Sequence, residues 1–225
     1  MALAIFDLDN TLLAGDSDYL WGRFLADTGA VDRAWYEQEN ERYYRAYEAG
    51  TLDIMEFLRF SLRPLKEQPL DRLLAWRERF LEQEIEPLIQ PPALELVERH
   101  RRAGDTLLII TATNRFVTEP IARRLGVPHL IATEPEQIDG RYTGEVSGIP
   151  SFREGKVERL QQWLQDHGET LRGSSFYSDS HNDIPLLERV ERPVAVDPDR
   201  ALAAHARRHG WPVISLRGAE VPGQE

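Results

Sequence analysis

The sequence predicts an α/β fold, in which a Rossmann-like doubly wound parallel sheet forms the core and an all-helical domain is inserted into it. Two observations predict this. After residue 91, short apolar runs alternate with helix-like stretches, a rhythm typical of parallel strands joined by right-handed crossovers. Between the first apolar run and residue 91, apolar residues recur only at helical spacing. We therefore expect a core of residues 1–15 and 91–225 and a helical insertion of residues 16–90.

The first strand is predicted at residues 2–6, where the apolar run ALAIF ends abruptly in Asp7-Leu8-Asp9. Helices are expected from about residue 18 to residue 86. Their starts are indicated by polar residues or proline, at Asp32, at Thr51 or Asp53, and at Pro69. Their ends are indicated by glycine or proline, at Gly29, Gly50, Pro64 and Pro87.

Beyond residue 91, helices and strands are expected in turn. The predicted helices span about residues 92–103, 116–125, 154–167, 182–190 and 199–208, and the predicted strands span residues 106–110, 129–132, 175–177, 193–196 and 212–215. Asp139-Gly140, between short alternating runs, predicts a hairpin turn that we expect to decorate the core. Residues 218–225 are expected to form a loose tail.

Composition excludes several classes of function. The chain has 225 residues, a formal charge of −11 and no cysteine. Such an acidic surface repels nucleic acid and anionic membranes, and the lack of cysteine excludes disulfides, zinc ribbons and iron–sulfur clusters. No apolar run approaches the roughly 20 residues of a membrane helix, and no secretory signal is visible, so a cytoplasmic location is expected.

Polar side chains follow three of the predicted strands, at the point where each strand ends. The first group is Asp7 and Asp9, the second is Thr111, Thr113 and Asn114, and the third is Asp179, Asn182 and Asp183. In an open α/β sheet the carboxyl ends of the strands form the ligand site. We therefore expect these side chains to converge on one rim of the sheet.

Lys156 opens the helix that leads into the third group, and it is one of only two lysines in the chain. Carboxylates brought so close repel one another and need a positive partner to remain ionised. Oxygen ligands without histidine or cysteine favour a hard cation, and Mg²⁺ fits best. A metal, a lysine and a hydroxyl neutralise a transferring phosphoryl group, so the sequence predicts phosphoryl transfer.

The chain contains, in this order, DLDNT, TATN, Lys156 and SDSHND. Together these resemble the four motifs of the haloacid dehalogenase superfamily of phosphatases. The resemblance covers essentially the whole chain. The insertion is similar to the superfamily's helical C1 cap, as in its phosphoserine phosphatase branch, subfamily IB. The resemblance implies that Asp7 is the nucleophile that forms an aspartyl-phosphate and that Asp9 is the general acid and base. Dehalogenases lack an acid at the Asp9 position, so the resemblance favours a phosphatase.

The same resemblance implies the remaining roles. Thr111, the backbone of Ala112, Lys156 and Asn182 would hold the phosphoryl group of a small phosphorylated metabolite. The cofactor Mg²⁺ would be bound by Asp7, the backbone carbonyl of Asp9, and Asp179, with Asp183 just behind.

Residues of the helical insertion indicate which class of substrate the protein accepts. Asp16 stands where phosphoserine phosphatases usually have a glutamate that meets the substrate amine, whereas Ser61 stands where they have an arginine for the carboxylate. Arg59 and Arg63 lie nearby but out of register.

The segments FDLDNTLLAGDSDYLWGRFL and YSDSHNDIPLLE resemble a subgroup that includes histidinol-phosphate phosphatases. We therefore expect Asp16 to hold an amine and cap aromatics such as Trp21, Tyr43 or Tyr47 to flank an imidazole, with at most two or three of the cap aromatics at the pocket.

Alternatives remain open at this point. A lone Asp pair after a strand is most often a turn or a helix cap, and Thr111 and Thr113 could merely cap the next helix. Phosphoserine or another small metabolite could be the substrate. A phospho-accepting regulatory protein or a catalytically silent relative is the alternative of another class. However, a phospho-accepting receiver needs no acid at the Asp9 position, and a silent relative would usually have lost Asp7 or Lys156, which are both present. The sequence leaves monomer or homodimer open.

Overall fold

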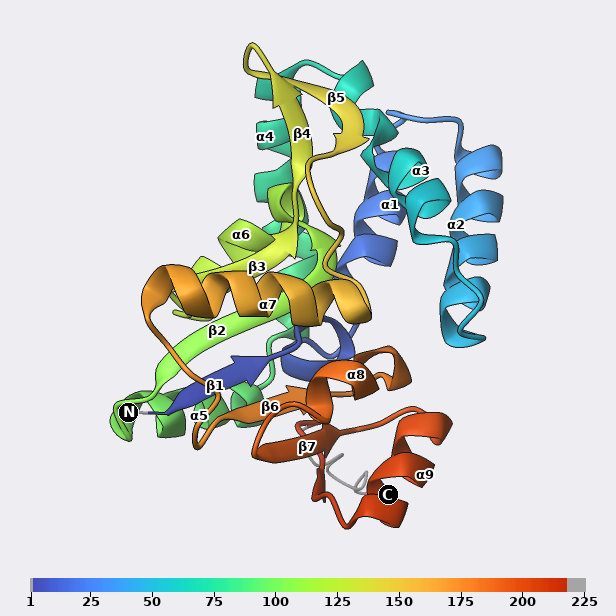
Figure 1. The fold of residues 1–225 in the computed structure, drawn as a ribbon. Coiled ribbons are helices and arrows are strands. Elements are labelled where there is room, and N and C mark those ends of the chain that lie inside the picture. Colours follow the sequence, from blue (N-terminus) through green and yellow to red (C-terminus); the bar gives the residue numbers. More distant parts are fainter. Residues whose placement is uncertain (1, 218–225) are drawn as a thin grey trace, which may run out of the picture.

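The computed structural model describes residues 2–217, so the tail expected at residues 218–225 lies outside the described part. Six parallel strands form one sheet in the order β3-β2-β1-β6-β7-β8 (Figure 1). Their bounds are β1 Leu3–Phe6, β2 Thr106–Asn114, β3 His129–Thr133, β6 Ser175–Ser178, β7 Arg192–Val196 and β8 Val213–Ile214. The strand order reverses at β1, which pairs with both β2 and β6. This topological switch point is where α/β sheets bind ligands.

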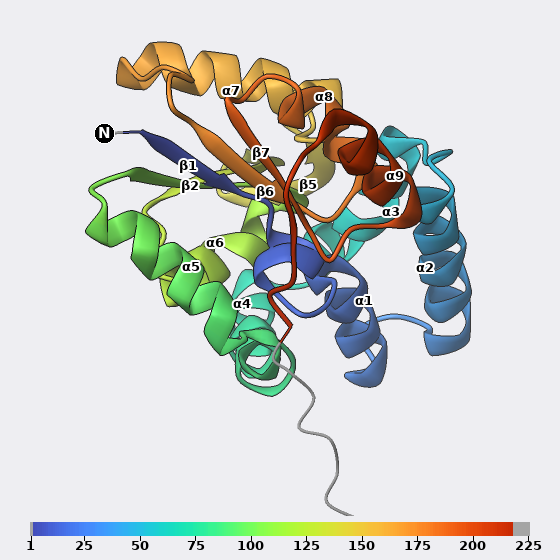
Figure 2. The same cartoon turned by 90° about the horizontal axis from the view of Figure 1, so that it is seen from below.

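Helices cover both faces of this sheet (Figure 2). The helices are α5 Pro91–Arg102 and α6 Arg115–Arg124 on one face, and α7 Glu154–His167, α8 Ile184–Leu187 and α9 Arg200–His209 on the other. Successive residues of a strand point to opposite faces, so Ala4 and Phe6 pack with α5 and α6, while Leu3 and Ile5 pack with α7, α8 and α9. The predicted doubly wound α/β core is confirmed.

A helical segment stands between β1 and β2 in the chain. It consists of α1 Ser17–Asp27, α2 Arg33–Glu48, α3 Ile54–Glu67 and α4 Leu70–Phe80, followed by the turns Leu81–Ile85 and Glu86–Leu88. The expected starts at Asp32 and Asp53 are confirmed, because each side chain accepts backbone N–H groups of the following helix. The expected stop at Pro64 is wrong: α3 continues to Glu67, since Pro64 is buried with Leu62 and Leu65 and this packing outweighs one lost hydrogen bond.

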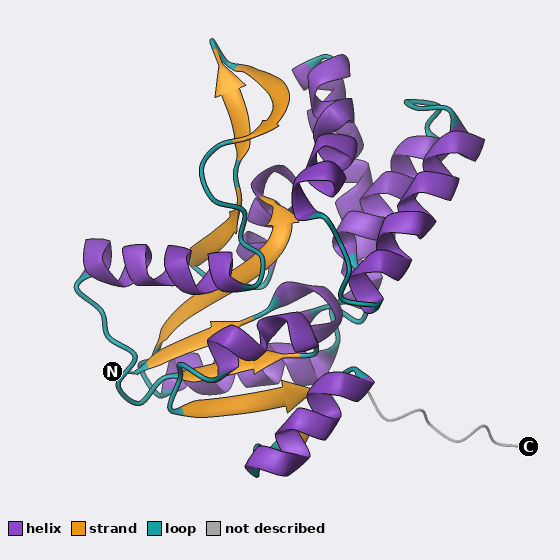
Figure 3. Cartoon of the chain, turned by 45° about the vertical axis from the view of Figure 1, so that its right-hand side comes forward, coloured by secondary structure: helices purple, strands orange, loops and turns teal. Residues whose placement is uncertain are grey.

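The predicted hairpin turn is present between β4 Pro135–Ile138 and β5 Arg141–Val146. Asp139 and Gly140 have φ of 51° and 74°, the two positive values that tight hairpins require. However, the hairpin is not only a decoration of the core. It stands apart from the main sheet beside the helical segment, where β5 packs against α3 and Arg59 pairs with Glu145 at 3.4 Å (Figure 3).

Two other elements differ from expectation. The helix expected at residues 182–190 is a tight turn at His181–Asp183 followed by the four residues of α8, because the Ser180 side chain accepts the Asn182 N–H and starts a separate turn. The strand β2 runs four residues beyond its expected end and pairs with β3 again at Asn114 and Thr133, after an irregularity. The polar group from Thr111 to Asn114 therefore belongs to the end of the strand itself.

The chain passes between core and helical segment at two places that lie side by side. Leu13 pairs with Ile89 as an antiparallel bridge, and the Ala14 N–H donates to the Leu88 carbonyl at 2.9 Å. The helical segment is thus held at both ends above the carboxyl edge of the sheet. Within residues 2–217, no helix combines the length and the apolarity needed to cross a membrane.

Candidate active site

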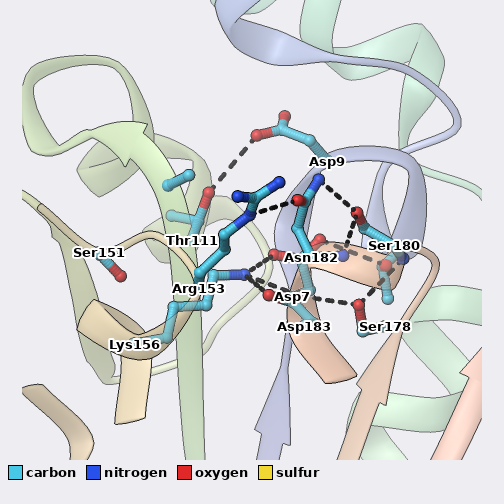
Figure 4. A network of polar contacts seen from close by, with 12 residues as sticks. Asp7, Asp9, Thr111, Ser151, Arg153, Lys156, Ser178, Ser180, Asn182 and Asp183 are labelled. Carbon is cyan, nitrogen blue, oxygen red and sulfur yellow. Dashed lines mark hydrogen bonds and ion pairs between the residues drawn. The ribbon is translucent and has the colours of Figure 1, made fainter. Parts of the chain in front are cut away.

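The carboxyl edge of the sheet brings the predicted side chains together around the end of β1 (Figure 4). Asp7 follows β1 directly, and its backbone N–H donates to the carbonyl of Tyr177 in β6. The chain then forms a tight turn at Leu8–Leu12. Within this turn Asp9 and Asn10 have non-helical backbone angles, and Asn10 has a φ of 54°. This turn buries Leu8 and places Asp9 in the same pocket as Asp7.

Lys156 lies between two buried carboxylates. Its Nζ is 2.8 Å from Asp7 Oδ1 and 2.8 Å from Asp183, and the Ser178 hydroxyl donates to Asp183 at 2.7 Å. Only 4% of Lys156 is exposed. Burial disfavours its charge, but the two carboxylates outweigh burial and raise the pKa of Lys156, so the ammonium group stays protonated.

One lysine does not satisfy the carboxylates at this edge. Burial raises the pKa of Asp7 to about 7, with Asp183 adding to the shift and Lys156 opposing it. Burial and the neighbouring Asp7 also raise the pKa of Asp179 well above its usual range. The Thr11 hydroxyl lies 3.4 Å from Asp7 Oδ2 and 3.1 Å from Asp179 Oδ1, but it has a single proton to donate. The site therefore has more negative charge than its own partners neutralise.

This donor set fits a hard divalent cation. Asp7 and Asp179 offer carboxylate oxygens, which Mg²⁺ accepts together with backbone carbonyls, water and phosphate. Within residues 2–217, no three side chains of His, Cys, Asp or Glu are grouped as a metal centre. A set of two carboxylates and one backbone carbonyl contains only two such side chains, so it is compatible with that result.

Asp9 is held on a different wall of the pocket. One carboxylate oxygen accepts the Ser17 N–H at 2.7 Å, and the other accepts the Thr113 hydroxyl at 2.8 Å and faces the Thr111 hydroxyl at 3.4 Å. Burial and then the charge of Asp16 raise the pKa of Asp9 to about 6, against the effect of its hydrogen bonds. A carboxyl group with this pKa can both give and take a proton near neutral pH.

The pocket above these residues lies between the core and the helical segment. Its lining is Asp7, Asp9, Asn10, Asp16, Asp18, Tyr19, Asn40, Tyr43, Tyr44, Tyr47, Leu52, Ile54, Phe57, Thr111, Ala112, Thr113, Phe152, Lys156, Asn182 and Asp183. The predicted residues Thr111, Ala112 and Asn182 thus line the same pocket as Lys156. Asp179 is not among the lining residues, but the Thr11 hydroxyl that faces Asp7 also faces Asp179.

Two expectations about the cap aromatics are wrong. Trp21 is 2% exposed and packs against Phe24, Phe80 and Phe116 in the core, so it cannot meet a ligand in the pocket. Four tyrosines line the pocket rather than two or three, because α1 and α2 together present a tyrosine face there. Ser61, Arg59 and Arg63 are not among the lining residues, and within residues 2–217 Lys156 is the one lysine or arginine that is.

Asp16 and Asp18 form an acidic wall of the pocket, and Asp18 was not predicted from the sequence. Asp16 lines the pocket as expected, but its Oδ1 accepts the N–H groups of Asp18 and Tyr19 and caps α1. Asp18 lines the same wall and has a longer contact of 3.5 Å with Asn114 Nδ2. Burial followed by the charges of Asp16 and Asp9 raises the pKa of Asp18 well above its usual range. The signal was present in the segment AGDSDYLW, where a second acid follows Asp16 by two residues.

Comparisons with known proteins agree with this geometry. Residues 4–188 match the family model of the haloacid dehalogenase-like hydrolases. A histidinol-phosphatase of Neisseria meningitidis is 46% identical over 96% of this chain and 99% of its own length. The phosphoserine phosphatase SerB1 of Mycobacterium tuberculosis is 31% identical over 96% of this chain and 71% of its own length.

Solved structures show the same fold. A crystal structure of a Bordetella pertussis protein of unknown function superposes with a TM-score of 0.91 at 49% identity, covering 96% of this chain and 99% of that one. A phospho-aspartyl intermediate analogue of phosphoserine phosphatase superposes with a TM-score of 0.70 at 20% identity, covering 96% and 93%. The chain therefore belongs to the haloacid dehalogenase-like hydrolase family and is a phosphatase of that family.

Proposed function

We propose that the protein is a Mg²⁺-dependent phosphomonoester hydrolase that acts through an aspartyl-phosphate on Asp7, with histidinol phosphate as its substrate. The observation that carries the proposal is the buried contact of Lys156 with Asp7 and Asp183, with the carboxyl group of Asp9 in the same pocket. A nucleophile, a fixed positive charge and a proton donor then surround one space for a phosphoryl group.

The proposed reaction has two steps. First, an Asp7 carboxylate oxygen attacks phosphorus, the bond from phosphorus to the ester oxygen breaks, and Asp9 gives its proton to the departing alkoxide. Second, Asp9 takes a proton from water, the water oxygen attacks phosphorus, and the bond to Asp7 breaks to release inorganic phosphate. The pKa of Asp9, raised to about 6, supports both of its roles.

Lys156 and the metal would each neutralise part of the negative charge of the phosphoryl group. Asp7, Asp179 and the Asp9 carbonyl would hold Mg²⁺, with Asp183 behind them. When bound, Mg²⁺ supplies positive charge that neutralises phosphoryl oxygens. Lys156 Nζ, together with Thr111, the backbone of Ala112 and Asn182, would bind the remaining oxygens. The helical segment of residues 16–90 would act as a cap that closes on the substrate and hinges around residues 14–16 and 87–91.

The lining of the pocket supports a cationic, flat leaving group. Asp16 and Asp18 form an acidic wall that suits an amine, and the tyrosine face suits an imidazole. No arginine among the lining residues of the described part would pair with a substrate carboxylate. These features favour histidinol phosphate over phosphoserine, and the similarity to the Neisseria histidinol-phosphatase supports the same choice.

A hydrolysis panel tests the proposal. The wild-type protein is assayed for phosphate release from histidinol phosphate, phosphoserine and p-nitrophenyl phosphate, with Mg²⁺ and with excess EDTA. We expect kcat/KM to be highest for histidinol phosphate and turnover to require Mg²⁺. Asp7→Asn removes the nucleophile and should abolish turnover of all three esters.

Each result of the panel has a separate meaning. A higher kcat/KM for phosphoserine would overturn the substrate but not the chemistry. Turnover by the Asp7→Asn variant would overturn the aspartyl-phosphate. No hydrolysis of any ester, in a wild-type protein that still binds vanadate with Mg²⁺, would favour the phospho-accepting regulatory alternative.

A further inference from the structure

The C-terminal end of α2 touches the core beside the phosphate-binding residues. The Tyr47 hydroxyl donates to Ser180 Oγ at 3.1 Å, and the Gly50 carbonyl accepts from Arg153 Nη2 at 2.6 Å. Burial followed by nearby carboxylates raises the pKa of Tyr47 well above its usual value, so its hydroxyl remains a donor. Both core partners are bonded to Asn182: Ser180 Oγ accepts its backbone and side-chain N–H groups, and Arg153 donates to its amide oxygen.

Gly50 is adapted to this contact. Its φ is 70°, a value that side-chain-bearing residues rarely adopt. A Cβ there would lie 3.0 Å from His181 Nε2 and 3.4 Å from Arg153 Nη2. The helical segment approaches the core this closely because residue 50 has no side chain.

Arg153 joins this glycine to the pocket. While Nη2 donates to Gly50, Nε donates to Asn182 Oδ1 at 2.8 Å (Figure 4). The backbone of Arg153 has φ of 49° and ψ of −121°, outside the regions that L residues favour. Such a conformation persists only where the surroundings hold it, and it is concentrated at functional sites. Arg153 also lies three residues before Lys156, at the start of α7.

The bond to Arg153 determines which end of the Asn182 amide is free. The amide oxygen accepts from Arg153, and one proton of Nδ2 faces Ser180 Oγ at 3.3 Å. The second Nδ2 proton is left for the pocket, which Asn182 lines beside Lys156. Without the guanidinium, the amide could turn over and present its oxygen to an anion, which would be repulsive.

We propose that Arg153 is a positioning residue: its guanidinium orients the Asn182 amide as a donor to the phosphoryl group and, by binding the Gly50 carbonyl, couples that orientation to closure of the helical segment. The inference rests on the proposed function, because it assumes that Asn182 meets the phosphoryl group. Arg153 itself touches neither substrate nor metal in this arrangement.

A double-mutant cycle tests the coupling. Binding of vanadate with Mg²⁺ is measured by calorimetry for the wild-type protein, Arg153→Ala, Asn182→Ala and the double variant. We expect Arg153→Ala to weaken binding about 10-fold, the equivalent of one lost hydrogen bond of ~1.4 kcal/mol. The double variant should bind as Asn182→Ala does, because Arg153 acts through Asn182. Effects that multiply in the double variant would overturn the proposal, as would unchanged binding in Arg153→Ala.

Hydrogen exchange tests the proposed coupling to closure of the helical segment and does not require turnover. The Gly50 and Thr51 amides close the end of α2 by bonding to Tyr47 and Ala46. We expect vanadate with Mg²⁺ to protect these amides in the wild-type protein and not in Arg153→Ala. Equal protection in both would overturn the coupling to closure.

Two further variants separate positioning from a general loss of structure. Arg59→Ala removes an exposed arginine that also links the helical segment to another element, Glu145 of β5, but lies away from Asn182. It should bind vanadate like the wild-type protein. Arg153→Lys keeps one charged donor without the fork, so we expect intermediate binding. Binding as tight as that of the wild-type protein would show that charge alone suffices and would overturn the role of the guanidinium geometry. Binding of vanadate by a wild-type protein that hydrolyses no ester would count against the proposed function alone.

Discussion

At the scale of single residues, Asp9 shows how environment assigns a role to a carboxyl group. Only one residue separates Asp7 from Asp9 in the chain, yet Asp7 faces the Lys156 ammonium whereas Asp9 faces hydroxyl and backbone donors. Lys156 lowers the pKa of Asp7 and so favours the ionised form that attacks, although burial and the charge of Asp183 together outweigh this effect. The two pKa values, about 7 and about 6, are both raised mainly by burial.

Replacing Asp9 should affect esters according to their leaving groups. Asp9→Asn removes the proposed proton donor, and we expect kcat for an alkyl phosphate to fall about 10²- to 10⁴-fold. Nitrophenolate leaves as a stable anion, so p-nitrophenyl phosphate should lose much less in the first step. Steady-state kinetics with both esters checks this, with the exposed Asp166→Asn as the control of the same chemical change. An equal loss for both esters would contradict the role of Asp9 as general acid.

At the scale of elements, the start of α1 connects the helical segment to the chemistry. Asp16 accepts two backbone N–H groups at the first turn, and the adjacent Ser17 N–H donates to Asp9. The helix end that Asp16 stabilises therefore also holds Asp9, the proposed proton donor, in place. The start of α3 has the same capping geometry at Asp53, but Asp53 is exposed to solvent and is not among the residues that line the pocket.

These two caps allow a matched comparison. Asp16→Ala and Asp53→Ala should each lower the free energy of unfolding by about 1 kcal/mol, because each helix loses its capping acceptor. Only Asp16→Ala should also lower kcat/KM, since it loosens the turn that positions Asp9. Thermal denaturation and hydrolysis kinetics of both variants check this. Full activity in Asp16→Ala would show that the α1 cap is structural and that neither the amine nor Asp9 depends on it.

At the scale of the whole molecule, the helical segment and the sheet share one hydrophobic core. Trp21, Leu25 and Leu58 belong to the same cluster as Phe6 and Ile109. A much smaller cluster around Tyr36, Tyr43 and Phe60 holds α2 to α3. Closure is therefore expected to move α2 and the start of α3 more easily than α1, whose burial against the core opposes its displacement.

The crowded carboxylates make the stability of the metal-free protein dependent on pH. The folded state raises the pKa of Asp7 to about 7 and that of Asp9 to about 6, whereas unfolded aspartates titrate near about 3.9. Between about pH 4 and pH 7 the folded state binds more protons, so its stability falls as pH rises. We expect a lower Tm at pH 8 than at pH 5 in EDTA, and recovery at pH 8 when Mg²⁺ is added.

Asp7→Asn provides the control for this effect. It removes one of the repelling charges, so the fall in Tm between pH 5 and pH 8 should be smaller in this variant. A Tm that rises over the same range in EDTA for the wild-type protein would contradict the raised pKa values. Recovery by Mg²⁺ that is as large in Asp7→Asn as in the wild-type protein would place the cation elsewhere.

Local patterns explain which features could be predicted. The turn at Asp139 and Gly140 depends on backbone preferences of two adjacent residues, and alternation of strands with helices implies parallel pairing wherever the strands lie. The meeting of Asp7 and Asp183 at Lys156 followed from the same rule, because carboxyl ends of parallel strands share an edge. Asp18 was not predicted, since two acids near a helix start are indistinguishable until the capping bonds are known.

The sequence by itself therefore determined the fold class, the order of the chemical groups along the chain and their convergence on one edge, because these depend on local periodicity and on strand topology. Only the tertiary structure decided that Asp16 caps a helix while Asp18 faces the pocket, that Trp21 is in the core, and that the hairpin rests on α3. It also decided the link from Gly50 through Arg153 to Asn182. Those outcomes depend on contacts between residues far apart in the chain, where packing and burial select one partner among several that the sequence allows.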